Sequence, residues 1–350
     1  VIRVLTVLSK IAIPAMCDPI TSISSVPIST PNVNVLCVVA FFSVNSTSSP
    51  SAKTKKSLSS PWYFESSSIL SNTIFSDASL SIVLTEKIND HMKKISLLGS
   101  TGSIGTNVLD VIERNPEKFQ ILGMSAGNNV DLFAKQIRKF KPRVVALFDT
   151  KKIPTLKERI SDLDIEILSG EEGSITVATL PEADVVVSGV MGSAGLLPAI
   201  YALKSGKNLA LANKETLVIA GELVLKEAEK TNSQIIPIDS EHSAIFQALN
   251  GEKKEQIKKI ILTASGGAFR NYSLDQMENI TVKDALNHPN WNMGSKITID
   301  SSTMMNKGLE YIEAKWLFGT NTPVEIIVHP QCIIHSMIEF VHSSIIAQLG

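Results

Sequence analysis

Residues 288–310 bring together side chains of the kinds that bind phosphate groups and metal ions. The segment reads HPNWNMGSKITIDSSTMMNKGLE and contains an imidazole, an indole, three consecutive hydroxyls, a carboxamide, an ammonium and a carboxylate. A strand-like run at residues 296–299 precedes a helical pattern at residues 304–316. The hydroxyls of residues 301–303 are therefore expected to cap that helix and to meet an anion there.

The helix predicted after these hydroxyls carries further polar groups. Asn306 and Glu310 lie four residues apart and share one face, and Lys307 borders that face. Each residue alone is also explained by an amphipathic helix with a solvated charged face. The density of the whole cluster favours a ligand site.

Two carboxylates that follow an apolar run of strand length are candidate metal ligands. In an extended backbone Asp239 and Glu241 project to the same side, while Ser240 faces the other way. Glu310 would add a third carboxylate, and such an all-oxygen set suits Mg²⁺ or Mn²⁺ better than zinc. The alternative is that Asp239 or Ser240 N-caps a helix predicted at residues 243–249.

A glycine-rich turn follows the first predicted strand and opens the first predicted helix. It reads GSTGSIG over residues 99–105, and its glycines allow a pyrophosphate to approach the helix N-terminus. Its GxxGxxG spacing departs from GxGxxG, and tight packing alone is the alternative. The next strand ends in SAGNN at residues 125–129 without a carboxylate, which favours NADP over NAD. Asn128 and Asn129 could donate hydrogen bonds to the cofactor or serve as turn residues.

Three further segments carry polar groups at the predicted ends of strands. Asn213, Lys214 and Glu215 lie at the carboxyl edge of the predicted sheet, where α/β proteins bind ligands. The segment TASGGAFR at residues 263–270 places a Ser-Gly-Gly turn where it could clamp a small anion and move as a lid. The two histidines of HPQCIIH at residues 329–335 are more simply explained as buried structural groups.

The alternation of short apolar runs with amphipathic segments predicts an α/β fold with a doubly wound, mostly parallel sheet. The predicted strands cover residues 95–98, 121–124, 144–147, 165–168, 185–187, 208–211 and 235–238. The predicted helices cover residues 104–114, 130–140, 194–204 and 216–229. The rhythm changes near Asp239, so we place a domain boundary there, between residues 92–238 and residues 239–350.

Composition excludes several classes of protein. A chain of 350 residues with 44% hydrophobic and 19% charged side chains can form two domains with ordinary cores. The 33 basic and 34 acidic side chains nearly balance, and no basic block suggests a nucleic-acid partner. No apolar run approaches the roughly 20 residues that span a membrane. Three scattered cysteines indicate neither a disulfide framework nor a zinc site, and they favour a reducing compartment.

Residues 1–91 differ from the rest of the chain, because they are rich in serine and contain no glycine, and Met92 is a natural start. We expect a disordered extension outside the domains, whose deletion leaves folding and activity intact. An organelle transit peptide should be rich in arginine and poor in acids, whereas this segment has one arginine and five acidic residues. We therefore favour upstream sequence read through into the frame over a transit peptide.

Six sequence blocks occur in order and at consistent spacing from Met92 to Gly350: GSTGSIG, ALANKE, DSEHSAIFQ, TASGGAFR, HPNWNMG and DSSTMMNKGLEYIEAKW. Together they resemble the 1-deoxy-D-xylulose 5-phosphate reductoisomerase family of the non-mevalonate isoprenoid pathway. The resemblance implies a Rossmann-like NADPH-binding domain, a second α+β catalytic domain with a mostly open sheet, and a homodimer. It implies a metal-assisted rearrangement of a phosphorylated sugar to 2-C-methyl-D-erythritol 4-phosphate, with hydride from NADPH. The expected location is the cytoplasm of a bacterium, or a plastid if residues 1–91 are a transit peptide.

The resemblance also implies roles for individual residues. The catalytic residues would be Lys214, Glu241, His288 and Glu310. NADPH would contact Thr101, Gly102, Ser103, Ile104, Gly127, Asn129, Asn213, Glu215 and Gly294. The substrate would contact Lys214, Ser240, Ser265, His288, Ser301, Asn306 and Lys307, with Trp291 on a closing lid. The metal ion, Mg²⁺, Mn²⁺ or Co²⁺, would be bound by Asp239, Glu241 and Glu310.

Two departures from the family pattern bear on activity. Asn128 stands where many members have lysine, so we expect no charge contact with the 2′-phosphate of NADPH. The family continues past the equivalent of Gly350 into a C-terminal helical domain, so an inactive NADPH-binding fragment is one alternative function. A phosphorylating aldehyde dehydrogenase is another, and its nucleophile would have to be Cys332, the only cysteine after Met92.

Overall fold

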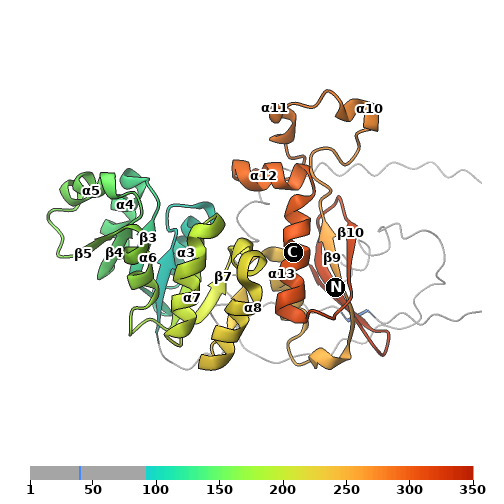
Figure 1. The fold of residues 1–350 in the computed structure, drawn as a ribbon, viewed down its shortest axis with the longest axis horizontal. Coiled ribbons are helices and arrows are strands. Elements are labelled where there is room, and N and C mark those ends of the chain that lie inside the picture. Colours follow the sequence, from blue (N-terminus) through green and yellow to red (C-terminus); the bar gives the residue numbers. More distant parts are fainter. Residues whose placement is uncertain (1–38, 41–91, 350) are drawn as a thin grey trace, which may run out of the picture.

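The computed structural model describes residues 39–40 and 92–349 (Figure 1). The prediction that residues 1–91 form a disordered extension therefore lies almost wholly outside the described residues. The exception is the short strand β1 (Val39–Ala40), which pairs antiparallel with β12 (Ile345–Leu349). These two residues of the extension thus add an edge strand to the second sheet.

A seven-stranded sheet forms the first half of the described chain, and every neighbouring pair of its strands is parallel. Its order is β5-β4-β3-β2-β6-β7-β8, so the direction of winding reverses between β2 and β6. The predicted doubly wound sheet is confirmed. Its strands are β2 (Lys93–Leu98), β3 (Phe119–Ala126), β4 (Val144–Leu147), β5 (Glu166–Ser169), β6 (Val185–Ser188), β7 (Asn208–Leu211) and β8 (Ile235–Pro237).

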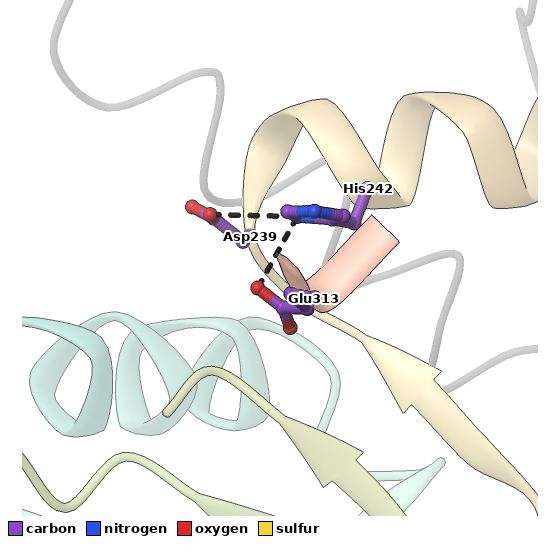
Figure 2. Close-up of side chains that lie close together, drawn as sticks. All are labelled: Asp239, His242 and Glu313. Atoms are coloured by element: carbon purple, nitrogen blue, oxygen red, sulfur yellow. Dashed lines mark ion pairs between the residues drawn. The ribbon is translucent and has the colours of Figure 1, made fainter. Parts of the chain in front are cut away.

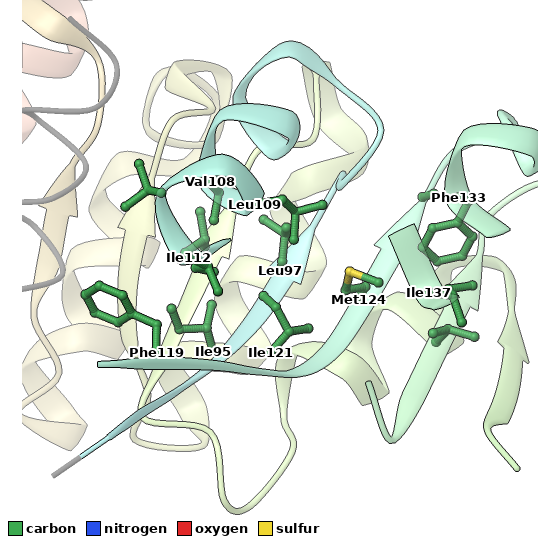
Figure 3. Packing of buried hydrophobic residues seen from close by; sticks show 14 of the residues in the cluster. Ile95, Leu97, Val108, Leu109, Ile112, Phe119, Ile121, Met124, Phe133 and Ile137 are labelled. Carbon is green, nitrogen blue, oxygen red and sulfur yellow. The ribbon is translucent and has the colours of Figure 1, made fainter. Parts of the chain in front are cut away.

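Helices cover both faces of this sheet, which explains why its strands read as continuous apolar runs. Ile95 and Leu97 of β2 face one buried cluster, where they pack with Val108 of α3 and Phe133 of α4 (Figure 3). Leu98 belongs to the cluster on the opposite face. The helical segments are α3 (Ser103–Arg114), α4 (Val130–Phe140), η1 (Thr150–Lys152), α5 (Ile153–Arg159), α6 (Gly170–Ala178), η2 (Gly192–Gly195), α7 (Leu196–Lys204) and α8 (Lys214–Thr231).

A second, mixed sheet of five strands has the order β1-β12-β11-β9-β10 and stays open. The strand β10 (Val324–Val328) runs parallel to β9 (Ile257–Ala264), whereas β11 (Ile334–Phe340) runs antiparallel to it. The helices α9 (Ser240–Ala248) and α13 (Met305–Phe318) bury apolar side chains with β9 and β11. The predicted α+β architecture of this part is confirmed, and the boundary near Asp239 stays a prediction.

The loop between β9 and α13 carries only short helices. The elements α10 (Leu274–Met277) and α11 (Val282–Ala285) lie at its outer end, above α12 (Ser295–Ser302) (Figure 1). The one-turn element η3 (Lys254–Gln256) precedes β9. Among the described residues, no helix combines the length and the apolar character that crossing a membrane requires.

The prediction of a strand at residues 296–299 is wrong, because these residues lie inside α12. The alternating Ile-Thr-Ile pattern favours a strand locally. In the folded chain, Thr298 bonds back to the carbonyl of Gly294 at 2.9 Å, and Lys296 pairs with Asp300 one turn later at 2.7 Å. These local contacts support the helix.

Candidate active site

The candidate site depends on how closely α8 packs against α13. The helix α8 is kinked at Ala220, whose φ of −143° and ψ of 36° are not helical. The next residue, Gly221, lies against the indole of Trp316, and a Cβ atom there would collide with the ring. Roughly two turns earlier in each helix, the same approach sets Lys214 of α8 beside Glu310 of α13.

The three candidate metal ligands come together, although not by the geometry that we predicted. Ser240 already begins α9, so Asp239 and Glu241 do not alternate along a strand. Asp239 holds the N-cap position, but its carboxylate pairs with Lys214 at 2.7 Å rather than with the helix amides. Ligand oxygens of Asp239, Glu241 and Glu310 all lie within 4.8 Å of one another. Three carboxylates at this separation fit a hard divalent cation.

Two buried lysines bridge these carboxylates. Lys214 Nζ lies 2.7 Å from Asp239 and 3.3 Å from Glu310. Lys307 Nζ lies 3.0 Å from Glu241 and also contacts the second carboxylate oxygen of Glu310. Two ammonium groups therefore face three carboxylates, and the remaining negative charge favours an added cation.

The pKa values follow from burial and from these charges. Burial alone would lower the pKa of Lys214 and of Lys307, but the facing carboxylates outweigh it and raise both. Burial alone would raise the pKa of Asp239 and of Glu241, but the lysine charges outweigh it and lower both. Burial and the nearby Glu241 raise the pKa of Glu310. Glu310 thus relies on the neighbouring positive charges to stay ionised.

Ser265 and His288 form a second polar cluster at the start of the long loop. The backbone amides of Asn290 and Trp291 donate to His288 Nδ1 at 3.2 Å and 2.9 Å, so the proton of the neutral ring lies on Nε2. That Nε2–H donates to Ser265 Oγ at 3.0 Å. Burial and the charge of Arg270 lower the pKa of His288, which favours the neutral ring.

Ser265 is left with a hydroxyl proton to donate. Its Oγ accepts from His288 and, at 3.3 Å, from the amide of Gly267. Two accepted hydrogen bonds occupy both lone pairs of the oxygen, so its own proton is available for an anion. This is the arrangement that a phosphate oxygen would need.

The turn at Ser265 packs against the end of α12. Gly267, with a φ of +71°, lies so close to the carbonyl of Ser301 that a Cβ atom would collide with it. The prediction that residues 301–303 cap the following helix is only partly right. Ser301 and Ser302 belong to α12, while Thr303 Oγ1 accepts a long hydrogen bond of 3.4 Å from the amide of Met305.

Two residues expected to contact phosphate also contact the carboxylate cluster. Asn306 accepts from Lys214 Nζ at 2.8 Å and donates to Glu310. Lys307 pairs with Glu241 and Glu310. In the described structure, the carboxylate cluster and the Ser265–His288 cluster are thus linked through α12 and the first turns of α13.

The glycine-rich turn after β2 lies at the reversal point of the first sheet. Gly99 has a φ of +80°, and a Cβ atom on it would lie 2.7 Å from the carbonyl of Gly189, which follows β6. Gly102 is the N-cap residue of α3, and both it and Ser103 are exposed. Because Gly102 has no side chain to cap the helix, the first-turn amides stay open to a pyrophosphate.

The other candidate cofactor residues lie near the ends of β3 and β7 or beside α12. Asn213 follows β7 and donates to the carbonyl of Gly192 at 2.8 Å. Glu215 pairs with Lys296 of α12 at 2.6 Å, and Gly294 is the N-cap residue of that helix. The side chain of Asn129 caps α4 by accepting a hydrogen bond from the backbone amide of Leu132 at 3.2 Å. Asn129 therefore has the structural role at the turn that was one of its two predicted roles.

The sequence matches two family models over most of its described length. Residues 95–221 match the model for 1-deoxy-D-xylulose 5-phosphate reductoisomerase, and residues 235–318 match the model for the C-terminal domain of that enzyme. A reductoisomerase of Microcystis aeruginosa is 55% identical over 262 residues, covering 74% of this chain and 67% of the relative. The chain belongs to the 1-deoxy-D-xylulose 5-phosphate reductoisomerase family.

Other similar sequences and structures support this family assignment. The reductoisomerase of Nostoc punctiforme is 54% identical, over 74% of this chain and 66% of the relative. A crystal structure of a reductoisomerase in complex with NADPH, fosmidomycin and magnesium is 42% identical with a TM-score of 0.70, covering 74% of this chain and 66% of that one. A Zymomonas mobilis reductoisomerase with NADPH is 40% identical with a TM-score of 0.69, over 74% of this chain and 67% of the other. The chain thus spans about two thirds of the length of the family members that it matches.

The structure places a lysine, Lys152, beside Asn128. Lys152 of η1 donates through Nζ to the backbone carbonyl of Asn128 at 2.9 Å. A positive charge therefore stands at the end of β3, although Asn128 carries none. The signal in the sequence was the pair Lys151-Lys152, which follows the third predicted strand after three residues.

Three more residues, for which the sequence patterns predicted no role, lie beside the two polar clusters. Arg270 of TASGGAFR donates to the carbonyl of Ser265 at 2.9 Å and lowers the pKa of His288. His242 of DSEHSAIFQ and Glu313, three residues after Glu310, are both buried beside the carboxylate cluster. The i,i+3 spacing of the two glutamates was the available signal, because it puts them on one helix face.

Proposed function

We propose that this chain converts 1-deoxy-D-xylulose 5-phosphate to 2-C-methyl-D-erythritol 4-phosphate with NADPH and a divalent metal ion. The observation that carries the proposal is the cluster of Asp239, Glu241 and Glu310, bridged by two buried lysines. Relatives of the same family have been seen with NADPH, magnesium and fosmidomycin, which supports the assignment.

The carboxylate cluster would act on the ketose end of the substrate. A divalent cation held there would polarise the carbonyl, which promotes cleavage and re-formation of a carbon–carbon bond. Lys214 Nζ stands between Asp239 and Glu310, so it can donate a hydrogen bond to a substrate hydroxyl or carbonyl beside them. Ser240, whose hydroxyl now bonds Glu241 at 2.7 Å, can turn toward the same oxygens.

The phosphate end would be held at the Ser265–His288 cluster. Ser265 has a proton to donate, and Ser301 lies against the same turn. Binding the phosphate away from the reacting carbons supplies positioning energy for the rearrangement. The aldehyde that the rearrangement forms would then accept hydride from NADPH and a proton to give the alcohol.

A direct assay tests this proposal. Purified chain is mixed with NADPH, 1-deoxy-D-xylulose 5-phosphate and Mg²⁺, and NADPH oxidation is followed by absorbance. Oxidation that requires both substrate and metal ion supports the reductoisomerase. NADPH binding without turnover would identify an NADPH-binding fragment instead, and oxidation that does not depend on the sugar phosphate would point to another reductase.

The lysine beside Asn128 leads to a prediction about cofactor choice. Replacing Lys152 by alanine should weaken NADPH binding by about 5- to 10-fold, because an exposed ion pair contributes about 1 kcal/mol. NADH lacks the 2′-phosphate, so its affinity should not change. Fluorescence titration with both cofactors measures the effect, and Lys151→Ala is the matched control. An equal loss for NADPH and NADH would place Lys152 away from the 2′-phosphate.

The cysteine required by an aldehyde dehydrogenase provides a second prediction. Cys332 is partly buried, and burial raises the pKa of its thiol, which disfavours a nucleophilic thiolate. Cys332→Ser should keep the reductoisomerase turnover within about twofold of the parent, whereas loss of a nucleophile costs orders of magnitude. Substitution is preferable to alkylation, because Asn290 of the long loop contacts the sulfur. A variant without turnover but with normal NADPH binding would revive the dehydrogenase.

The assembly and the location stay predictions. We expect a homodimer that acts on a small phosphorylated sugar, without a nucleic-acid or membrane partner. The expected location is the cytoplasm of a bacterium, or a plastid if residues 1–91 act as a transit peptide. Light scattering of the purified protein would test the dimer.

A further inference from the structure

A second cluster shares Asp239 with the carboxylate site and also contains His242 and Glu313. Figure 2 shows the side chains of these three residues close together. His242 Nδ1 lies 3.5 Å from Asp239 and 3.4 Å from a carboxylate oxygen of Glu313. His242 and Glu313 are both 0% exposed. The ring is further held by Phe318, which stacks on it with an interplanar angle of 11°.

Each ring nitrogen of His242 faces an acceptor. His242 Nε2 lies 2.8 Å from the backbone carbonyl of Glu310, which can only accept, so Nε2 carries a proton. The atoms facing Nδ1 are carboxylate oxygens of Asp239 and Glu313. The imidazole thus connects the start of α9 with two positions of α13.

Glu313 depends on this ring. Within the described residues neither of its carboxylate oxygens has a hydrogen-bond donor, although the side chain is fully buried. Leaving a buried carboxylate without a polar partner is costly, and His242 is the group that the geometry places beside Glu313. Glu313 lies one helical turn after Glu310, so the same ring contacts the helix at both residues.

We propose that Glu313 is a positioning residue for the metal site and acts through His242. Its carboxylate holds the ring where one nitrogen faces Asp239 and the other holds the backbone of Glu310. Two of the three metal ligands, from α9 and α13, are thereby kept at the separation that the ion requires. The inference rests on the proposed function, because it assumes that Asp239, Glu241 and Glu310 bind a cation.

Binding of Mn²⁺ to Glu313→Gln tests the inference directly. The variant keeps the volume of the side chain and removes its charge. Titration followed by electron paramagnetic resonance should show Mn²⁺ affinity reduced by about 10- to 100-fold, the usual loss for such a partner. NADPH affinity should stay at the parent value, and turnover should recover toward the parent value at saturating Mn²⁺. Glu227→Gln removes another buried glutamate, ion-paired with Lys230 in α8, and should leave Mn²⁺ affinity unchanged.

Three results would overturn the inference. Parent-like Mn²⁺ affinity in folded Glu313→Gln would make Glu313 merely structural. Two Mn²⁺ ions per parent chain, falling to one in the variant, would make Glu313 a ligand of a second ion. A parent chain that binds NADPH but no Mn²⁺ would remove the proposed metal function itself. If Glu313→Gln does not fold, His242→Gln interrupts the same link and should show the same selective loss of Mn²⁺ affinity.

Discussion

Replacing Glu310 by glutamine is expected to lower turnover by on the order of 1,000-fold, about 4 kcal/mol in activation free energy. Glu310 is the most buried of the three candidate ligands, so glutamine there removes a metal ligand that solvent cannot replace. Glutamine keeps the shape of the side chain but not its charge. The chain should still fold, because Lys214 keeps Asp239 as a partner and Lys307 keeps Glu241.

Steady-state kinetics and Mn²⁺ titration together measure this effect. NADPH affinity should stay near the parent value, because the glycine turn before α3 belongs to the other sheet. Glu222→Gln, at an exposed ion pair on α8, is the control for a lost glutamate charge. Undiminished turnover in Glu310→Gln would remove Glu310 from the metal site.

Replacing Lys307 by alanine is expected to raise the KM for the sugar phosphate by roughly 10- to 150-fold, the equivalent of one charge-assisted hydrogen bond of about 1.5–3 kcal/mol. NADPH binding should change far less. The structure adds a second consequence, because Lys307 now compensates Glu241 and Glu310. Without it the metal-free chain should lose about 3–5 kcal/mol of stability, and saturating Mn²⁺ should restore part of that loss.

Lys315→Ala is the matched control for this prediction. Lys315 lies on the same helix, but its ammonium bonds the carbonyl of Thr322, away from the carboxylate cluster. The Lys315→Ala variant should have the KM of the parent, and its stability should not respond specifically to the absence of Mn²⁺. An unchanged KM in Lys307→Ala would show that the ammonium serves only to neutralise the carboxylates.

Sequence patterns predicted the first sheet better than the second part of the chain. The strands from β2 to β8 read as apolar runs because helices bury both of their faces, and this burial leaves a direct trace in the sequence. At residues 296–299, by contrast, β-branched residues suggested a strand, whereas hydrogen bonds within the segment and a lysine–aspartate pair accompany a helix. Local propensity is a weak guide where no neighbouring strand is available to pair.

The three candidate metal ligands lie together as predicted, but the extended backbone on which the prediction rested does not occur. Asp239 and Glu241 were expected on one side of an extended strand, yet α9 begins between them. Their approach to Glu310 comes from the packing of α9, α8 and α13, in which Gly221 admits the indole of Trp316. Such packing depends on residues far apart in the chain, so no local pattern could reveal it.

The sequence by itself determined the family, the parallel sheet, the glycine turn and the acidic and basic groups available for chemistry in residues 288–310. These features follow directly from the order and spacing of residues along the chain. Only the tertiary structure decided which polar groups contact one another. Two lysines lie between three carboxylates, Lys152 lies beside Asn128, and Glu313 lies beside His242. The physical reason is that ion pairing depends on distances of a few ångströms and on burial, and both arise only when distant helices pack together.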